Sequence, residues 1–322
     1  MPEISSITQI PGIVVGHATN AEAGTGCTVI VCPAGATGAV DVRGGAPATR
    51  ETDLLRPEET VDVLHAVVLS GGSAFGLAAS TGVAEELERR DIGLDVTVAK
   101  VPIVSGACLF DLMCGSADVR PDAAMGAAAV CAAFNDADAP LARGNVGAGT
   151  GCTVGKVAGP ARSMKTGLGE CVRQAGELVC GAVAAVNAVG NVVDPATGAP
   201  VAGVLSADGT HIITVEEAFA ETAAAMPLRT NTTISCVVTN AHLTKAQATK
   251  VAQMSADAYA HAIRPTHTTN DGDSIFVMAT GEVEVQVDMV GMLATAALEG
   301  AIVDAAREAE GAFGLKAARD LA

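Results

Sequence analysis

Short apolar runs alternate with longer alanine-rich segments along the whole chain. The short runs are rich in β-branched residues and have the length of buried strands, whereas the alanine-rich segments have the length of helices. The predicted strands are residues 27–32, 66–69, 178–188, 201–205, 234–239 and 275–279, and the predicted helices are residues 76–90, 122–134, 215–225, 245–263 and 287–310. This alternation is typical of layered α/β structure.

The predicted helix at 245–263 has the best-defined start. Thr244 and Gln247 have the spacing of a capping box, in which each side chain accepts a hydrogen bond from the other residue's backbone N–H. The apolar face that follows consists of Val251, Met254, Ala258 and Ala262. We therefore expect this helix to pack against the core and to carry no chemistry.

Two segments interrupt the periodicity. Asp, Pro and Gly between residues 135 and 144 predict an exposed loop. Pro227 ends the pattern of a helix, and the segment 226–231 that contains it leads into the dipeptide Asn231-Thr232. The chain has no internal repeat and no low-complexity tract, so residues 1–322 are predicted to form one domain.

The core has to be built from small side chains. Hydrophobic residues make up 49% of the 322 residues but aromatic residues only 2%, and Trp is absent. A chain of this length can bury about three quarters of its unfolded surface. A core of Ala, Val, Leu and Gly favours helices and sheets that approach one another closely.

Charge and cysteine usage exclude several classes of protein. The formal charge of −17 argues against nucleic acid and anionic membranes as partners, because both need concentrated Lys and Arg. Nine cysteines, without a Cys-x-x-Cys pair, indicate neither a disulfide framework nor a zinc ribbon. The first six residues lack the order of a signal peptide, and no run reaches 18 apolar residues, so we expect a cytoplasmic protein.

Three apparent motifs do not hold. A phosphate loop ending at Lys156 would need glycine at 150 and a hydroxyl residue at 157, where the chain has Thr150 and Val157. The segment 70–76 resembles a nucleophile elbow but has Phe75 where glycine is required, so its glycines predict a tight strand-to-helix turn whose amides could hold a substrate carbonyl or carboxylate. Six histidines show no His-x-x-x-His spacing, although His267 could support the nearby Asp271.

The segments 229–235 and 271–274 carry the candidate chemistry. If the Asn231–Thr232 bond were cut, the new α-amine would lie beside the Thr232 hydroxyl and could act as its base. Such an amine has a pKa of roughly 7.7 to 8.0, close to working pH. Asp271 and Asp273 supply paired carboxylates, although an Asp-Gly-Asp sequence is also common in plain turns.

These motifs resemble the DmpA-type (P1, S58) peptidase family, and the Asn-Thr-Thr-Ile form is most similar to its nylon-oligomer hydrolase branch. The similarity covers nearly the whole chain, through residues 11–17, 41–45, 70–77, 147–149, 155–156, 186–190, 231–235, 238–240 and 271–273. The resemblance implies a four-layer αββα sandwich of the N-terminal-nucleophile-like, DmpA and ornithine-acetyltransferase type. It further implies self-cleavage into an α-chain of residues 1–231 and a β-chain of residues 232–322, assembled as a tetramer of αβ units.

The same resemblance assigns the site residues. Thr232 would be the nucleophile, and Lys156 would lie beside it and depress the pKa of its amine. Asn187 would help to hold the oxyanion. Asp273 would orient the amine or Lys156, while Asp271 would support Asp273 or serve as a structural cap. No cofactor and no metal are expected.

One position departs from the family pattern and leaves the substrate open. The nylon hydrolases have a tyrosine before aspartate where this chain has Phe110 before Asp111. The expected activity is hydrolysis of short oligoamides, including 6-aminohexanoate oligomers. The alternatives are an aminopeptidase acting on α- or β-peptides, an acyltransferase of the ornithine-acetyltransferase sort, and an uncleaved binding protein.

Overall fold

The computed structural model describes residues 4–137, 139–222 and 231–321. Its main strands form one hydrogen-bonded path in the order β10-β11-β14-β16-β2-β4-β7-β3, with β1 paired to β2. These strands are β1 (Val14–Asn20), β2 (Thr25–Val42), β3 (Thr49–Arg50), β4 (Leu64–Ser70), β7 (Val104–Cys108), β10 (Leu168–Ala175), β11 (Leu178–Asn187), β14 (Thr232–Ala241) and β16 (Ser274–Val283).

Strand β2 divides this path into two facing sheets. Its first half pairs with β1 and β4, its second half pairs with β16, and the register is irregular between Val31 and Ala36. Alternate residues of both sheets enter one shared core: Ile30, Val67 and Leu69 from the first sheet and Val183, Ile234, Cys236 and Phe276 from the second. The two sheets therefore pack face to face.

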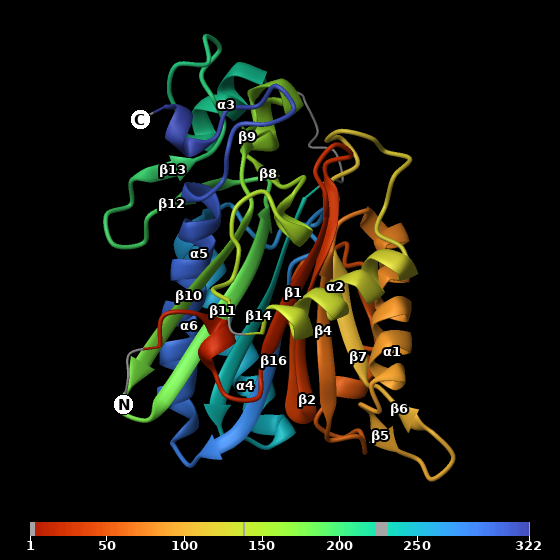
Figure 1. The fold of residues 1–322 in the computed structure, drawn as a ribbon. Helices are drawn as coiled ribbons and strands as arrows, with labels where there is room; N and C mark the ends of the chain where they lie inside the picture. The colour runs from red at the N-terminus through yellow and green to blue at the C-terminus, as the bar shows by residue number, and fades with distance from the viewer. Residues whose placement is uncertain (1–3, 138, 223–230, 322) are drawn as a thin grey trace.

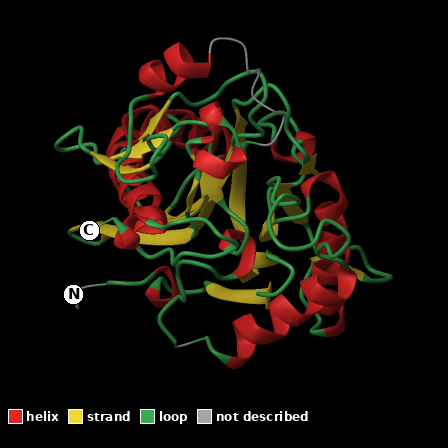
Figure 2. Cartoon of the chain, turned by 90° about the horizontal axis from the view of Figure 1, so that it is seen from above, coloured by secondary structure: helices red, strands yellow, loops and turns green. Residues whose placement is uncertain are grey.

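Helices cover the two outer faces (Figures 1 and 2). Helices α4 (Lys245–Ser255), α5 (Asp257–Ala262) and α6 (Val287–Arg307) share a core with β11, β14 and β16. Helices α1 (Ala79–Arg89) and α2 (Ala123–Asn135) share another with β2 and β4. The order of layers is helix, sheet, sheet, helix, which confirms the predicted four-layer αββα fold.

Small residues bring these layers close together, as the composition predicts. A Cβ built on Gly16 of β1 would lie 2.2 Å from the Ala129 carbonyl oxygen of α2. A Cβ built on Gly169 of β10 would lie 2.2 Å from the Ala301 carbonyl oxygen of α6. Neither position can accept a side chain unless the helix moves outward, so glycine sets the spacing of both outer layers.

Short elements complete the fold at its edges. They are β5 (Leu94–Asp95) with β6 (Lys100–Val101), β8 (Thr153–Val154) with β9 (Met164–Lys165), the sheet of β12 (Asn191–Val193), β13 (Pro200–Ala202) and β15 (Ile263–Arg264), and helix α3 (Val215–Thr222). The 3-10 turns are η1 (Ile7–Gln9), η2 (Asp53–Leu55), η3 (Ser73–Ala78), η4 (Gly147–Gly149), η5 (Lys156–Ala158), η6 (Pro160–Arg162) and η7 (Ala318–Asp320).

The structure changes three of the predicted elements. The predicted helix 245–263 keeps its capping box but breaks at Ala256, where Tyr259 N–H bonds the Ala256 carbonyl three residues back. The predicted strand 201–205 is strand β13 only as far as Ala202, followed by an isolated bridge between Leu205 and Ile212. The first turns of the predicted helix 76–90 are the 3-10 helix η3. The end of the predicted helix 215–225 and most of the segment 226–231 lie outside the described residues.

The cysteines and the longest helix belong to the core. Cys131 and Cys171 are half-buried, the other seven cysteines are buried, and all nine are free thiols. Helix α6 is long and apolar enough, by length and composition, to cross a membrane, but 56% of its apolar window is buried inside the protein. Within the described residues no cluster of His, Cys, Asp or Glu could hold a metal ion.

Candidate active site

Three strand ends bring the predicted site residues together. Strands β14 and β16 are parallel neighbours, so Thr232 at the start of β14 lies beside the acidic loop that leads into β16. Strand β11 runs antiparallel to β14, so its last residue, Asn187, is the register partner of Thr232. Thr232, the acidic loop and Asn187 therefore meet at one end of the second sheet.

The Thr232 hydroxyl is in contact with the peptide bond that it is predicted to cleave. Its Oγ1 approaches the carbonyl oxygen of Asn231. The N–H of Gly272 donates to both oxygens, at 3.1 Å to the Asn231 carbonyl and 3.2 Å to Thr232 Oγ1. Asn231 and Thr232 are both buried. A backbone donor therefore faces the oxygen that would become negative if the hydroxyl attacked this carbonyl.

Asp273 fixes the backbone that follows the nucleophile. Its Oδ1 accepts the Thr233 N–H at 2.7 Å, and its Oδ2 accepts Thr266 Oγ1 at 3.0 Å and the His267 N–H at 3.0 Å. The ring of His267 also contacts Oδ2, through Nδ1 at 2.9 Å. The structure thus places His267 on Asp273, whereas its spacing suggested Asp271. Asp273 therefore orients the start of β14.

Asp271 has one bonded and one unbonded oxygen. Its Oδ2 accepts the Thr268 N–H at 2.6 Å, which is the capping role left open by the sequence. Its Oδ1 is buried and has no hydrogen-bond partner among the described residues. Burial raises the pKa of this carboxyl, and the Asp273 carboxylate raises it further. Asp271 is therefore suited to exchange a proton beside the Asn231–Thr232 peptide bond as well as to cap the loop.

Lys156 and Asn187 form the other side of the site. Lys156 Nζ donates to the Asn187 side-chain oxygen at 2.7 Å and to its backbone oxygen at 2.9 Å. Burial lowers the pKa of Lys156 to about 8, although the Asp271 and Asp111 carboxylates act in the opposite direction. Gly155 makes this placement possible, because it has φ of 72° and a Cβ there would lie 2.1 Å from Gly203.

Two further residues fix the orientation of the Asn187 amide. Its Nδ2 donates to the Phe110 carbonyl at 2.8 Å, and its Oδ1 accepts the Thr153 N–H at 3.0 Å. Since Oδ1 also accepts from Lys156, the oxygen and nitrogen ends of the amide are assigned by their partners. The residue that departs from the family pattern, Phe110, thus takes part through its backbone.

The segment 70–76 forms the predicted tight strand-to-helix turn, between β4 and η3. Gly72 has φ of 82°, as a tight strand-to-helix turn requires. Its N–H donates to Asp111 Oδ1 at 2.7 Å, and the Gly71 N–H donates to the Gly26 carbonyl at 2.9 Å. Protein oxygens therefore occupy the amides of Gly71 and Gly72, and the role of the amides at the helix start itself stays a prediction.

The motif at 41–45 acts as a backbone clamp on the acidic loop. The N–H groups of Arg43 and Gly44 donate to the Asp273 carbonyl at 3.0 and 3.3 Å, and Ala46 N–H donates to the Asp271 carbonyl at 2.8 Å. A Cβ on Gly44 would lie 2.2 Å from that Asp271 oxygen. This close approach leaves no room for a side chain at position 44. The three backbone hydrogen bonds hold the loop that carries both carboxylates in place.

The five predicted site residues thus lie in one region, and each is held by contacts that sequence reasoning did not include. The residues it missed are Gly272, Thr153 and Tyr259, whose hydroxyl lies 2.9 Å from Ser235 Oγ and donates to the Thr233 carbonyl at 3.1 Å. Gly272 and Thr153 act through backbone N–H groups, which no side-chain pattern reveals.

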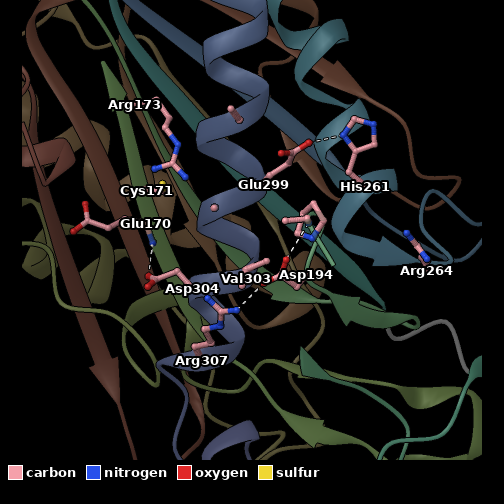
Figure 3. A pocket seen from close by; sticks show the side chains of 14 residues that line it. Glu170, Cys171, Arg173, Asp194, His261, Arg264, Glu299, Val303, Asp304 and Arg307 are labelled. Atoms are coloured by element: carbon pink, nitrogen blue, oxygen red, sulfur yellow. Dashed lines mark hydrogen bonds and ion pairs between the residues drawn. The ribbon is translucent and has the colours of Figure 1, made fainter. Parts of the chain in front are cut away.

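A separate groove of about 690 Å³ runs beside α6 and is lined by none of these residues (Figure 3). Its charged side chains are largely paired: Arg307 lies 2.8 Å from Asp194, and His261 contacts Glu299 at 2.5 Å. The Glu170 N–H also donates to Asp304 at 3.0 Å. The groove carries no nucleophile linked to a base and is not part of the candidate active site.

Solved structures share this architecture. The L-aminopeptidase D-Ala-esterase/amidase of Ochrobactrum anthropi, described as a variant of the Ntn hydrolase fold, matches with a TM-score of 0.69 at 17% identity over 96% of this chain and 88% of that chain. The αββα layers therefore define a protein of the Ntn-hydrolase fold.

The sequence relatives define the family. The profile of peptidase family S58 matches residues 5–319, and the chain belongs to this family. An uncharacterized aminopeptidase of Mycobacterium leprae is 42% identical over 295 residues, which is 87% of this chain and 80% of the relative. A 6-aminohexanoate-oligomer endohydrolase of Kocuria sp. is 34% identical over 278 residues, 85% of this chain and 75% of the relative. The protein is therefore a hydrolase of the peptidase and amidase type.

Proposed function

We propose that this protein is a self-processing amide hydrolase whose nucleophile is the N-terminal threonine created by cleavage between Asn231 and Thr232. The observation that carries the proposal is the contact of Thr232 Oγ1 with the Asn231 carbonyl, with the Gly272 N–H donating to both. Such a donor stabilises the oxyanion of a tetrahedral intermediate.

Self-cleavage requires only groups at this site. Thr232 Oγ1 attacks the carbonyl carbon of Asn231, and its proton passes to the carboxylate of Asp271, whose raised pKa makes it a better base. Asp271 returns the proton to the Thr232 nitrogen as the C–N bond breaks, which leaves an ester on Oγ1. Water hydrolyses this ester and releases the Asn231 carboxylate and the free Thr232 amine.

Turnover uses the same hydroxyl with a new base. The α-amine of Thr232 takes the Oγ1 proton as the oxygen attacks a substrate amide, and it then protonates the departing amine. Water deacylates the enzyme by the reverse proton transfers. We assign stabilisation of the oxyanion to the Asn187 amide and the Gly272 N–H. Lys156 favours the neutral form of the α-amine through its positive charge.

For substrates, we propose short oligoamides, including 6-aminohexanoate oligomers. The similarity to 6-aminohexanoate-oligomer endohydrolases supports this choice, while the similarity to mycobacterial aminopeptidases supports removal of single N-terminal residues from α- or β-peptides as the alternative. An ornithine-acetyltransferase-like acyl transfer would use the same nucleophile with an amine in place of water. The working form we propose is a cytoplasmic tetramer of αβ units.

Mass spectrometry of the purified protein tests the proposal. The wild type should give two fragments, residues 1–231 and 232–322, and Thr232→Ala should remain one inactive chain. Thr233→Val is the matched control, since the Thr233 hydroxyl makes no hydrogen bond among the described residues, and it should still be cleaved. An active wild type that stays uncleaved would overturn the proposal.

A substrate panel then separates the alternatives. Cleaved protein would be given 6-aminohexanoate oligomers, aminoacyl and β-aminoacyl amides, and an acyl donor with and without ornithine. Release of ω-amino oligomer fragments supports the oligoamide assignment. Release of only N-terminal α- or β-residues supports the aminopeptidase, and faster acyl-donor consumption with ornithine supports the transferase.

A further inference from the structure

A second buried lysine lies behind the site. The side chain of Lys165 is fully buried and forms no ion pair among the described residues. Its Nζ instead donates to three backbone carbonyls, at 3.1 Å to Cys152, 3.3 Å to Gly149 and 2.5 Å to Thr166. All three hydrogens of the ammonium therefore have an acceptor, which is what burial of such a group requires.

Two of these carbonyls, those of Gly149 and Cys152, belong to the turn that leads to Thr153, and the third belongs to Thr166, the residue after Lys165. The residue after Cys152 is Thr153, whose N–H donates to Asn187 Oδ1. Thr153 is also the register partner of Lys165 in the β8–β9 pair. The backbone of Lys165 therefore pairs with β8, and its side chain holds the turn just before β8.

Thr166 connects the same turn to the end of β11. Its N–H donates to the Cys152 carbonyl at 3.0 Å, and its hydroxyl donates to the Val186 carbonyl at 2.6 Å, one residue before Asn187. The 149–153 turn carries Thr153, and the end of β11 carries Asn187. The two bonds of Thr166 connect this turn to this strand end. A displacement of the turn would move the Thr153 N–H relative to Asn187 Oδ1.

We propose that Lys165 is a positioning residue, which holds the 149–153 turn so that Thr153 fixes the orientation of the Asn187 amide at the active site. This inference rests on the proposed function, because it concerns the oxyanion role assigned to Asn187. Lys165 itself touches neither Thr232 nor the scissile carbonyl through any bond that the described residues show.

The chain contains a matched control for this chemistry. Lys245 is also buried, and its Nζ also donates to three backbone carbonyls, those of Leu54, Glu59 and Val61 at 3.1, 2.9 and 3.0 Å. Its partners belong to the 54–61 segment and not to the 149–153 turn. Lys165→Met and Lys245→Met therefore remove the same kind of interaction, but only the first acts on the Asn187 amide.

The experiment compares kcat and KM of the processed enzyme in wild type, Lys165→Met, Lys165→Gln and Lys245→Met, with melting temperatures measured alongside. Lys165→Met should lower kcat roughly 10- to 100-fold, less than the loss of an oxyanion donor itself, with KM changed less than about 3-fold. Lys165→Gln retains an N–H donor and should recover part of kcat. Lys245→Met should lower the melting temperature and leave kcat unchanged.

A double-mutant comparison tests the route. In an Asn187→Ala background Lys165→Met should cost little further kcat, because the group that it positions is gone. An undiminished additional loss there, or wild-type kcat in folded Lys165→Met or Lys165→Gln, would overturn the proposal. Failure of both Lys165 variants to fold would also overturn it, since the residue would then be needed only for folding. A wild type that is never cleaved refutes the proposed function instead.

Discussion

Lys156 couples the charge state of the site to the orientation of Asn187. Its pKa is lowered by burial to about 8, so it is protonated at neutral pH and loses its charge as the pH rises through 8. The Asn187 oxygens then lose a charged donor, and the oxyanion loses a nearby cation. We predict that kcat falls above about pH 8.

Lys156→Arg checks this prediction, because a guanidinium stays protonated throughout the measurable range. Where the variant is active, its pH profile should lack the fall near pH 8. A wild-type profile that stays level to pH 10 would show that the Lys156 charge does not limit turnover.

The side chain of Phe110 leads to a second prediction at the scale of a single residue, about activity on ω-amino oligomers. Its carbonyl holds Asn187 Nδ2, a contact that any residue would preserve, so exchange of the side chain should not disturb the amide. If the missing tyrosine hydroxyl limits activity on ω-amino oligomers, Phe110→Tyr should raise the rate on 6-aminohexanoate oligomers. Phe110→Leu serves as the control, and an equal gain in both variants would assign the effect to side-chain size.

At the scale of elements, the loop before β16 packs against the Thr232 hydroxyl with little free space. A Cβ on Gly272 would lie 2.7 Å from Thr232 Oγ1, closer than real Cβ contacts come. Gly272→Ala should therefore displace the Gly272 N–H or the hydroxyl, and self-cleavage should slow by roughly the 10²- to 10³-fold typical of a lost oxyanion donor.

A time course of fragment formation measures the effect of Gly272→Ala. Gly209→Ala is the control, because a Cβ there meets nothing within 4 Å and only the positive φ of 68° is strained. Cleavage of Gly272→Ala at the control rate would mean that the Gly272 N–H does not act on the scissile carbonyl.

At the scale of the whole molecule, the buried thiols make stability depend on pH. Burial raises the pKa of Cys27, Cys152 and Cys180 to about 12, and it also raises those of Cys108 and Cys236. The folded state then holds protons that the unfolded state releases above about pH 8.5. The stability that these groups contribute is fully present below that pH and is lost as the pH rises towards the folded pKa values.

The buried lysines act in the opposite direction but are fewer. The pKa of Lys156 and of Lys165 is lowered to about 8, so these two groups add stability between pH 8 and their unfolded values near 10.4. With at least five thiols against two lysines, we predict a net fall in melting temperature above about pH 9. Thermal melts with a reductant at pH 7, 9 and 10 measure it, and a constant or rising melting temperature would contradict it.

The sequence determined the layered architecture and the place of the candidate nucleophile, Thr232. Short β-branched apolar runs and alanine-rich segments are local signals. They indicated β4, β11, β14 and the longer helices, but they missed β1, β7 and β10 and covered only the first half of β2. The Asn231-Thr232 dipeptide and the Asp271–Asp273 pair carry side chains whose chemistry is readable without coordinates. Family resemblance added Lys156 and Asn187, which as isolated residues would have been assigned to a surface and a turn.

Only the tertiary structure decided how these residues act on one another. The parallel pairing of β14 with β16 and the antiparallel pairing of β14 with β11 are non-local. These pairings bring Thr232, Gly272 and Asn187 together at one end of the second sheet. The decisive donors, Gly272 N–H and Thr153 N–H, are backbone groups present in every non-proline residue. Their roles come from position rather than from residue type, so they become visible only when the chain is folded.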